Sequence, residues 1–375
     1  MTPLSAGRLA PVVLHVSQPV EAGVAGVVSQ LVSDQVARGW PVSVACPAGH
    51  LAARSESAGA RWLAWDARRD PGMRTARELR DLRRIVAVVA PDVIHLHSSK
   101  AGLAGRLAVR RRTPTIFQPH AWSFHAVGGA RRVSAIAWER LAGRWTTTTI
   151  CVSRAECAEG QSAGIRGTWR LIPNGVDERA FDPCGPGGRA SARSRLGIPP
   201  DAPFAVCVGR LSRQKGQDVL LGAWPRVRSR FGDARLALVG DGPMGDELAR
   251  SLPEGVSLAG HRDDVADWYR ACDVVVLPSR WEGMSLALLE AMASGRAVVT
   301  TDVAGATEAL GLAGGAIVPV ESLADLADAI AARFADPDAA AAEGAANRRR
   351  IEDRFTLARM CGEVAELTLG LSAAR

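Results

Sequence analysis

The sequence predicts an α/β protein with two domains, each built on a doubly wound parallel sheet. Short apolar runs alternate with helical stretches along the chain, as in repeated β-α-β units. A stretch rich in glycine and proline, residues 183–188, interrupts this alternation and is typical of a linker. A chain of 375 residues is too long for one core of ordinary size, which also favours two domains.

The apolar runs define the expected strands. In the first half they lie at Val12–Val16, Val42–Ala45, Arg61–Ala64, Val93–His97, Thr115–Gln118, Thr148–Val152 and Arg170–Ile172. Helices are expected between them, near residues 24–38, 74–89, 101–111, 131–143 and 154–162. In the second half the expected strands are Phe204–Val208, Arg235–Val239, Val256–Ala259, Val274–Leu277, Ala297–Thr300 and Ala316–Val318. An alanine-rich helical tail is expected over residues 322–371.

Charge is distributed unevenly between the two halves. Residues 1–175 hold 23 Arg and Lys against 11 Asp and Glu, whereas residues 176–375 hold 23 against 28, so the net charges are +12 and −5. The basic residues of the first half gather in three clusters: Arg68, Arg69, Arg74, Arg77, Arg80, Arg83 and Arg84; Arg110–Arg112; and Arg131 with Arg132. They form either solvated helix faces or a surface that meets anionic lipid or a phosphate-bearing acceptor. Because the clusters contain few aromatic residues, we expect no nucleic-acid partner.

Cysteine usage and hydropathy indicate where the protein works. The seven cysteines form no C-x-x-C pair, which predicts free thiols in a reducing compartment and argues against a zinc cluster. No apolar run reaches roughly 18 residues, and the N-terminus lacks a secretory signal pattern. We therefore expect a cytoplasmic protein, held at the inner face of the plasma membrane if its basic clusters bind lipid. Neither a metal nor a cofactor is expected.

Two loops of the first half follow strands and precede helices, where doubly wound sheets bind ligands. Small residues around Gly23 let the backbone approach a phosphate or a sugar, although helix packing explains them equally well. Lys100 is one of only two lysines, with Lys215, among 46 basic residues. A lysine retained in so arginine-rich a chain is a candidate acceptor-side residue, and a solvated lysine on a capped helix is the alternative.

The third loop of the first half follows the strand Thr115–Gln118 and carries His120, Trp122 and His125. A histidine just beyond a strand end, with aromatic neighbours, is placed to touch a substrate. A structural histidine is the alternative for His120. Two histidines and a tryptophan together favour the functional interpretation.

Two loops of the second half carry basic residues at strand ends. Arg210 and Lys215 follow the strand Phe204–Val208, and together they can clamp a diphosphate and neutralise a leaving group. Arg262 follows the strand Val256–Ala259, where the backbone can read the edge of a base.

The stretch from Ser279 to Glu290 follows the strand Val274–Leu277. Ser285 is a candidate N-cap for a helix near residues 286–294, so Glu282 lies on the loop and Glu290 lies more than one turn into the helix. The amides of residues 283–286 then point outward from a helix N-terminus, an arrangement that binds anions and hydroxyls. Alone, the two glutamates fit solvated surface charges. Four consecutive strand ends with polar, glycine-rich loops favour a binding site.

Taken together, these motifs resemble those of glycosyltransferase family four. The matching segments are Gly209-Arg210 with Lys215-Gly216, Val239-Gly240-Asp241-Gly242-Pro243, Glu282 with Glu290, Ile172-Pro173-Asn174-Gly175-Val176-Asp177, and His120. The family consists of retaining sugar-nucleotide transferases of GT-B architecture, in which two Rossmann-like domains face a central cleft. The resemblance implies an acceptor-side domain at residues 1–175, a donor domain at 176–354, and a terminal helix at 355–375 that crosses back to the first domain. The loops at 95–106 and 120–125 resemble those of bacterial exopolysaccharide and lipid-linked-saccharide transferases.

The resemblance also implies a role for each candidate. Arg210 and Lys215 would hold the donor pyrophosphate, and Glu290 would bind the ribose hydroxyls. Glu282 and the amides of Gly283, Met284, Ser285 and Leu286 would hold the donor sugar, which His120 would also contact. Gly23 matches a loop near the phosphates, but Ala22 stands where the family often has a second glycine. The acceptor side would include Lys100, Trp122 and His125.

The activity implied is transfer of a hexose from a nucleoside-diphosphate sugar, expected to be a UDP-sugar, to a saccharide hydroxyl with retention at the anomeric carbon. The acceptor is expected to be lipid-linked or an exopolysaccharide precursor. Three alternatives stay open: a sugar-nucleotide epimerase of the same architecture, a transferase with a soluble small-molecule acceptor, and a catalytically silent partner subunit.

Overall fold

The computed structural model describes residues 10–68, 72–183, 188–311 and 313–374, and the chain divides into two compact units. The first unit contains residues up to 152, residues 156–172 and residues 361–375; the second contains residues 153–155 and 173–360. Most of the predicted linker, and Arg69 of the first basic cluster, lie outside the described residues. Among the helices described, none is both long and apolar enough to cross a bilayer.

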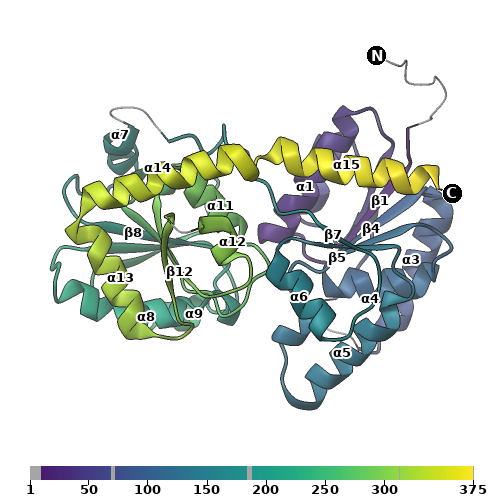
Figure 1. The fold of residues 1–375 in the computed structure, drawn as a ribbon, viewed down its shortest axis with the longest axis horizontal. Helices are drawn as coiled ribbons and strands as arrows, with labels where there is room; N and C mark the ends of the chain where they lie inside the picture. Colours follow the sequence, from purple (N-terminus) through teal and green to yellow (C-terminus); the bar gives the residue numbers. More distant parts are fainter. Residues whose placement is uncertain (1–9, 69–71, 184–187, 312, 375) are drawn as a thin grey trace. The chain divides into compact units, whose positions relative to one another are not determined.

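The first unit is a parallel sheet of seven strands in the order β3-β2-β1-β4-β5-β6-β7 (Figure 1). The strands are β1 (Val13–Ser17), β2 (Val42–Cys46), β3 (Arg61–Ala64), β4 (Val93–His97), β5 (Thr115–Gln118), β6 (Thr148–Cys151) and β7 (Trp169–Leu171). Neighbouring strands of this sheet pair in parallel. The strand order reverses between β1 and β4, so this is the doubly wound sheet that the sequence predicts.

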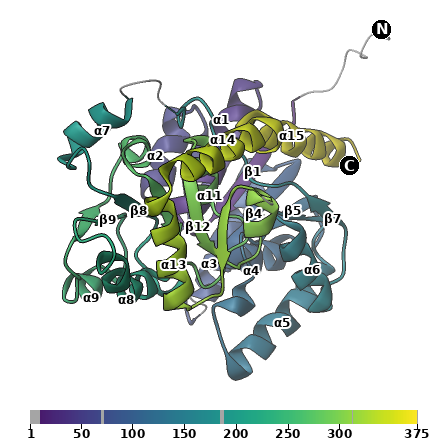
Figure 2. The same ribbon diagram turned by 60° about the vertical axis from the view of Figure 1, so that its left-hand side comes forward.

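Helices cover both faces of this sheet (Figures 1 and 2). They are α1 (Ala22–Ala37), α2 (His50–Ser57), α3 (Thr75–Val89), α4 (Ser98–Val109), the 3₁₀ turn η1 (Ser123–His125), α5 (Gly129–Gly143) and α6 (Arg154–Ser162). Side chains alternate along the strands: Leu14 and Val16 join the core under α3 and α4, whereas Val13 joins the core under α1. The short helix α2, rich in polar residues, was not predicted.

The second unit repeats the pattern with six parallel strands in the order β10-β9-β8-β11-β12-β13. The strands are β8 (Phe204–Val208), β9 (Arg235–Val239), β10 (Val256–Gly260), β11 (Val274–Leu277), β12 (Ala297–Thr301) and β13 (Gly315–Val318). Its helices are α7 (Gly188–Leu196), η2 (Arg213–Lys215), α8 (Gln217–Arg228), α9 (Gly245–Ala249), α10 (Val265–Ala271), α11 (Leu286–Ala293), α12 (Ala306–Leu310), α13 (Leu323–Ala335) and α14 (Pro337–Arg354). The side chain of Asp336 accepts a hydrogen bond from the Ala339 amide and so caps α14.

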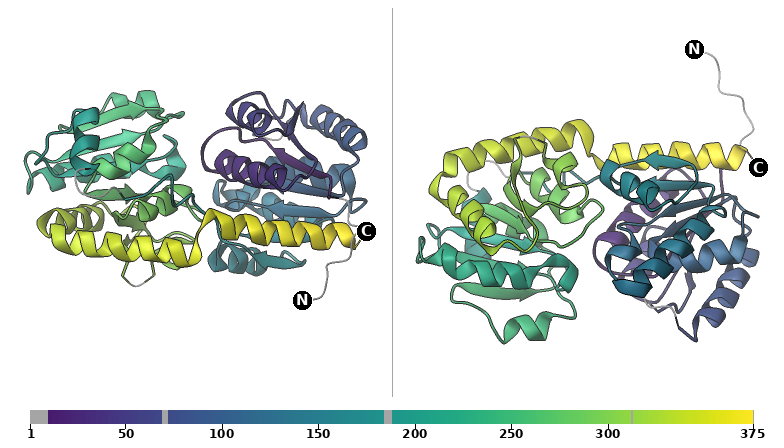
Figure 3. Two further views of the ribbon diagram at one scale, coloured as in Figure 1. Left: turned by 90° about the horizontal axis from the view of Figure 1, so that it is seen from above. Right: turned by 60° about the horizontal axis from the view of Figure 1, so that its bottom comes forward.

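The last helix, α15 (Leu357–Ala373), begins in the second unit and enters the first at Cys361. Within the first unit it packs on α1, because Ala365 shares a buried cluster with Val28 and Val32 (Figure 3). The Cys361 thiol lies 3.9 Å from the Gln30 carbonyl oxygen. The end of the chain thus completes the core of the unit that its beginning forms.

Candidate functional site

The candidate site of the second unit lies at the reversal of its strand order. Strands β8 and β11 are neighbours at the centre of the sheet, and the chain departs from them in opposite directions. Ligands of doubly wound sheets bind beyond the carboxyl ends of such strands. The loops concerned are residues 209–216 after β8 and residues 278–285 after β11, which carry most of the predicted donor residues.

Lys215 and Glu282 meet where these two loops approach each other. The Lys215 ammonium lies 2.6 Å from a carboxylate oxygen of Glu282, and both side chains are mostly buried, with exposed fractions of 19% and 11%. The Ser279 hydroxyl donates to the same oxygen over 3.0 Å. Since both loops are needed for this contact, two motifs 67 residues apart in the sequence form one site.

Close backbone packing holds the two loops in register. Gly216 has φ of +68°, and a Cβ at this position would overlap the carbonyl oxygen of Pro278. The Arg280 amide donates to the Gln214 carbonyl over 2.7 Å, and the Gln214 side chain donates to the Trp281 carbonyl over 3.0 Å. A residue other than glycine at position 216 would push the loops apart.

Arg280 was not singled out from the sequence, yet its guanidinium ties the loops to the surrounding helices. It donates to both carboxylate oxygens of Asp218 at 2.7 and 2.9 Å, to Glu321 at 2.8 Å, and to the Arg213 carbonyl at 2.8 Å. The hydrogen bond to Asp218 raises the pKa of Arg280 further above its ordinary value. Its position just after the end of β11 was the one sequence feature that could have marked Arg280 as part of the site. Its partners could not be predicted, because they come from three other segments of the chain.

Glu290 lies in the second turn of α11. The Tyr269 hydroxyl donates to its carboxylate over 3.0 Å, and burial raises the pKa of Glu290 above its ordinary value. Ser285 occupies the N-cap position, as predicted, but its side chain makes no capping hydrogen bond. Among the described residues the buried Ser285 hydroxyl has no hydrogen-bond partner. The side chain of Ser285 therefore does not cap the backbone amides at the N-terminus of α11.

The remaining predicted donor residues of the second unit lie at the same edge of its sheet. Arg210 is exposed, and within the described part of the chain no ion pair to its guanidinium is found. The exposed Arg262 forms a two-point pair with Asp264 at 2.6 and 2.8 Å, which fixes its side chain. Gly283 and Met284 are buried, and the Met284 carbonyl accepts from the Asn174 amide over 2.8 Å. Asn174 of the Pro-Asn-Gly motif thus braces the loop after β11.

In the first unit, His120 lies on a strained turn directly after β5. His120 and Ala121 both have positive φ, +53° and +83°, which is unfavourable for residues other than glycine. Glu156 holds this turn: one carboxylate oxygen accepts from the Ala121 amide over 2.7 Å, and the other accepts from the Val152 amide over 2.8 Å. Glu156 is fully buried and was missed by the sequence analysis, because its partners are two backbone amides that no sequence pattern marks.

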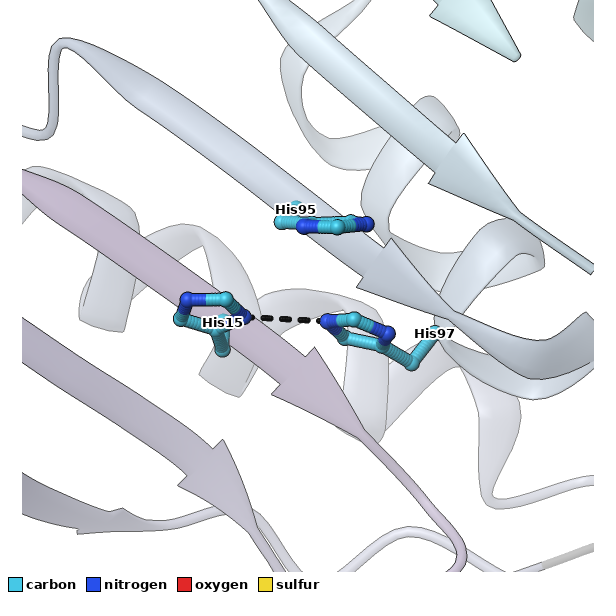
Figure 4. Close-up of side chains that lie close together, drawn as sticks. All are labelled: His15, His95 and His97. Atoms are coloured by element: carbon cyan, nitrogen blue, oxygen red, sulfur yellow. Dashed lines mark hydrogen bonds between the residues drawn. The ribbon is translucent and has the colours of Figure 1, made fainter. Parts of the chain in front are cut away.

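The residue His120 is partly exposed, and one of its ring nitrogens lies 3.2 Å from a ring nitrogen of His97. Desolvation lowers the pKa of His120 to about 3, so the imidazole is neutral near pH 7. His97 in turn belongs to a buried group with His15 and His95, whose ligand-type ring nitrogens lie within 4.8 Å of one another (Figure 4). The sequence analysis predicted no metal ligand set and did not consider these three together.

Two predicted residues of the first unit occupy less open positions. Lys100 is 4% exposed and forms a buried ion pair with Glu78 at 2.6 Å. Trp122 is 1% exposed and donates through its ring N–H to the Glu156 carbonyl. These contacts give both residues structural roles, and the solvated lysine considered as the alternative for Lys100 is wrong. Burial also argues against direct contact of either side chain with an acceptor.

His125 and Gly23 remain accessible. His125 is partly exposed and lies 3.0 Å from a Glu159 carboxylate oxygen. Gly23 is exposed in the first turn of α1, and a Cβ there would meet no atom within 4 Å. Space around Gly23 is compatible with a ligand beside this turn.

Comparison with known proteins agrees with the motifs. A model described as "Glycosyltransferase Family 4" matches residues 22–180, and one described as "Glycosyl transferases group 1" matches residues 202–336. Alpha-maltose-1-phosphate synthase of Mycobacterium tuberculosis is 32% identical over 324 residues, covering 78% of this chain and 81% of the relative. GDP-mannose-dependent alpha-(1-6)-phosphatidylinositol monomannoside mannosyltransferase of the same organism is 31% identical, covering 67% and 69%.

A solved structure has the same fold. Anabaena Alr3699/HepE in complex with UDP-glucose matches with a TM-score of 0.83 at 21% identity, covering 96% of this chain and 100% of that chain. Two doubly wound parallel-sheet domains of this kind define the GT-B class, as predicted. The chain belongs to glycosyltransferase family 4, and it is a glycosyltransferase.

Glu156 predicts a pH dependence of stability. Burial raises its pKa to about 7, against 4.5 for the free carboxyl, so its contribution to the free energy of unfolding is full below pH 4.5 and is lost as the pH rises through about 7. Glu156→Gln does not titrate. The stability advantage of the wild type over Glu156→Gln should therefore shrink by about 2 kcal/mol between about pH 5 and pH 8. Urea unfolding at both pH values measures this difference, and a constant difference would contradict the raised pKa.

Proposed function

We propose that this glycosyltransferase moves a hexose from a nucleoside-diphosphate sugar, expected to be a UDP-sugar, to a saccharide hydroxyl with retention at the anomeric carbon. The observation that carries the proposal is the contact of Lys215 with Glu282 at the strand reversal of the second unit. It puts one cation and one carboxylate side by side at the edge of the sheet. The cation suits the phosphates of a sugar nucleotide, and the carboxylate suits its hydroxyls.

We expect the diphosphate to replace Glu282 as the ion-pair partner of Lys215 when it binds. In the ligand-free protein Glu282 neutralises the Lys215 ammonium at 2.6 Å. A phosphate oxygen offers the same ammonium a second anion, and the exposed Arg210 adds a planar fork of donors. The carboxylate of Glu282 is then released to accept hydrogen bonds from hydroxyls of the donor sugar. No metal is required in this scheme, because the two cations balance the diphosphate.

Glu290 and the start of α11 supply the remaining contacts. The Glu290 carboxylate is held by Tyr269 and can accept from both hydroxyls of a ribose. The amides at the N-terminus of α11 offer donors to the sugar or phosphate. Catalysis would consist of charge stabilisation and positioning. We assign contact with the donor sugar also to His120, whose neutral ring suits a sugar hydroxyl.

For retention, we propose a front-face path through an oxocarbenium-like state. The phosphate leaving group accepts the proton of the acceptor hydroxyl, so no protein nucleophile is needed. Arg210 and Lys215 stabilise the charge that develops on that leaving group. The two glutamates therefore act in binding and do not form an acid-base pair of the hydrolase kind.

The acceptor is proposed to be lipid-linked or an exopolysaccharide precursor. One relative is named for transfer from GDP-mannose to a phosphatidylinositol mannoside, which supports a lipid-linked saccharide. The maltose-1-phosphate synthase relative supports the alternative of a soluble acceptor. A sugar-nucleotide epimerase of the same architecture would instead release an altered sugar nucleotide without any acceptor, which a product assay distinguishes.

Lys215→Ala should abolish recognition of the donor diphosphate. In thermal-shift measurements with UDP-glucose, GDP-mannose and other sugar nucleotides, a ligand at about 100 times its Kd stabilises the fold by about 2.7 kcal/mol. We expect wild type to be stabilised by a UDP-sugar, and Lys215→Ala not to be. Arg213→Ala is the matched control, since it removes an exposed cation from the same loop and should respond as wild type. Equal responses of wild type and Lys215→Ala would remove Lys215 from the site.

Glu290→Gln should weaken nucleotide binding while the fold persists. The amide can still accept from Tyr269, but it cannot accept charge-assisted hydrogen bonds from two ribose hydroxyls. Calorimetric titration of the nucleoside diphosphate should show a Kd roughly tenfold higher, equivalent to about 1.4 kcal/mol. An unchanged Kd would refute the ribose assignment.

Contact with an anionic membrane through the basic first unit is a further part of the proposal. On α5 the exposed Arg131 and Arg132 lie next to Val133, which is 68% exposed, so cations adjoin an exposed apolar side chain. Exposed arginines also line α3 and residues 110–112. Such a face suits the inner leaflet, where each basic residue near the surface contributes about 1 kcal/mol.

Binding to vesicles that contain phosphatidylserine should fall as salt rises, because the Debye length shortens. Cosedimentation should be several-fold weaker for Arg131→Gln/Arg132→Gln than for wild type. The control Arg349→Gln/Arg354→Gln removes two exposed cations from α14 of the second unit and should bind as wild type does. Binding indifferent to salt, or equal loss in both variants, would refute membrane contact through α5.

A further inference from the structure

Four imidazoles occupy the centre of the first unit. His15 lies on β1 opposite His95 of β4, and His97 lies two residues further along β4. Residues two apart on a strand share a face, so all three point to the side of the sheet that α1 covers. Figure 4 shows these three side chains, each of which is at most 1% exposed. His120 follows on the turn after β5.

Three of the rings form a continuous line of hydrogen-bond contacts that begins at Gln35 of α1. The Gln35 side-chain oxygen lies 2.9 Å from His15 Nε2, His15 Nδ1 lies 3.0 Å from His97 Nε2, and His97 Nδ1 lies 3.2 Å from His120 Nε2. Burial lowers the pKa values of all three rings well below neutrality, His15 to about 4. Each neutral ring therefore carries one N–H and one bare nitrogen.

Neutral rings in a line can be protonated in only two ways. Each contact between nitrogens needs one N–H and one lone pair, so all the hydrogen bonds run in the same direction, either toward Gln35 or away from it. The group at the closed end selects the direction. Because the Gln35 oxygen is an acceptor, the proton of His15 must lie on Nε2, which leaves His15 Nδ1 bare. His15 Nδ1 then accepts from a proton on His97 Nε2, which leaves His97 Nδ1 bare. In the same way, His97 Nδ1 accepts from a proton on His120 Nε2.

We propose that Gln35, His15 and His97 form a directional relay that sets the tautomer of His120, with its proton on Nε2 and its Nδ1 bare. The residues of the relay are positioning residues, since none of the three has an exposed side chain. His120 then offers a hydrogen-bond acceptor at Nδ1 and cannot donate from that atom. This deepens the proposed function and rests on it in one respect: the ligand group at Nδ1 would be a donating hydroxyl of the sugar.

His95 provides an internal comparison beside the relay. Its Nε2 lies 3.1 Å from the side-chain oxygen of Gln118, so the same reasoning places its proton on Nε2. Among the described residues its buried Nδ1 has no partner, and an unpartnered acceptor is tolerated better than an unpartnered N–H. The His95 ring stacks on His97 at 4.0 Å between centroids but exchanges no hydrogen bond with it. His95 is thus a histidine with an equivalent glutamine partner outside the relay.

The alternative to the relay is a metal ion bound by His15, His95 and His97, because their ring nitrogens lie within 4.8 Å of one another. A metal-bound nitrogen must be bare. The relay instead places a proton between His15 Nδ1 and His97 Nε2, which are 3.0 Å apart and already satisfy each other. The two arrangements are mutually exclusive, because a shared proton and a metal ion cannot both occupy the contact between His15 and His97.

The test is nuclear magnetic resonance of protein labelled with ¹⁵N in the histidine rings, which distinguishes a bare ring nitrogen from a protonated one. The chain has seven histidines, so the spectrum is small enough to assign by substitution. We expect His15, His97 and His120 to carry the proton on Nε2 and to have bare Nδ1 atoms near pH 7. In Gln35→Met the direction is no longer set, so His120 Nδ1 should become partly protonated.

Gln118→Met is the matched control. Gln118 and Gln35 are both buried and each contacts one histidine Nε2, but only Gln35 belongs to the relay. The control should alter the His95 signals and leave His120 unchanged. A proton on Nδ1 of any relay ring in the wild type would overturn the proposal, as would equal responses of His120 to both variants.

Metal analysis of the purified wild type completes the test. Stoichiometric zinc that is lost in His15→Gln would show the metal site and refute the relay, whereas absence of bound metal together with the expected tautomers supports the relay. The tautomers are measured without any substrate. If the protein transferred no hexose, the spectra would therefore be unchanged. If the relay were absent, the binding results expected for Lys215→Ala and Glu290→Gln would still hold.

Discussion

The ion pair between Lys215 and Glu282 is the contact on which the candidate donor site depends. It joins the loop after β8 to the loop after β11, and a glycine at position 216 lets those loops approach closely. Arg280 then anchors the pair of loops to Asp218 and Glu321. Charge, close backbone approach and strand order together hold the two loops in place, so that ligand binding has to exchange only the partner of Lys215.

The first unit uses a different physical device. Several of its buried polar groups have close partners: Glu156 accepts from two backbone amides, and the rings of His15 and His97 contact each other. A buried polar network is costly unless each member has a partner, so such a network defines side-chain orientation closely. The strained turn at His120 persists because Glu156 fixes the adjacent amide. We infer that the main contribution of this unit to the proposed activity is the orientation of the His120 side chain, more than any charge.

Much of the fold, and the grouping of Lys215, Glu282 and Glu290 at one edge of a sheet, were predictable from the sequence. Buried parallel strands are uniformly apolar, so Phe204–Val208 and Val274–Leu277 were located to the residue. Loop glycines and the rare Lys215 marked the strand ends. The polar helix α2 was missed because its pattern is weak. Helix α4 begins at Ser98 rather than near residue 101, and Ser98 has a positive φ.

The sequence by itself determined the family, the two doubly wound sheets and the set of polar residues at strand ends, because these follow from local patterns of hydropathy, glycine and charge. Only the tertiary structure decided how those residues are used. It placed Lys100 in a buried ion pair with Glu78, put Trp122 in the core, and brought His15 beside His97 across 82 residues. The physical reason is that burial, pairing and the direction of a hydrogen bond depend on neighbours from distant segments, which a one-dimensional pattern does not contain.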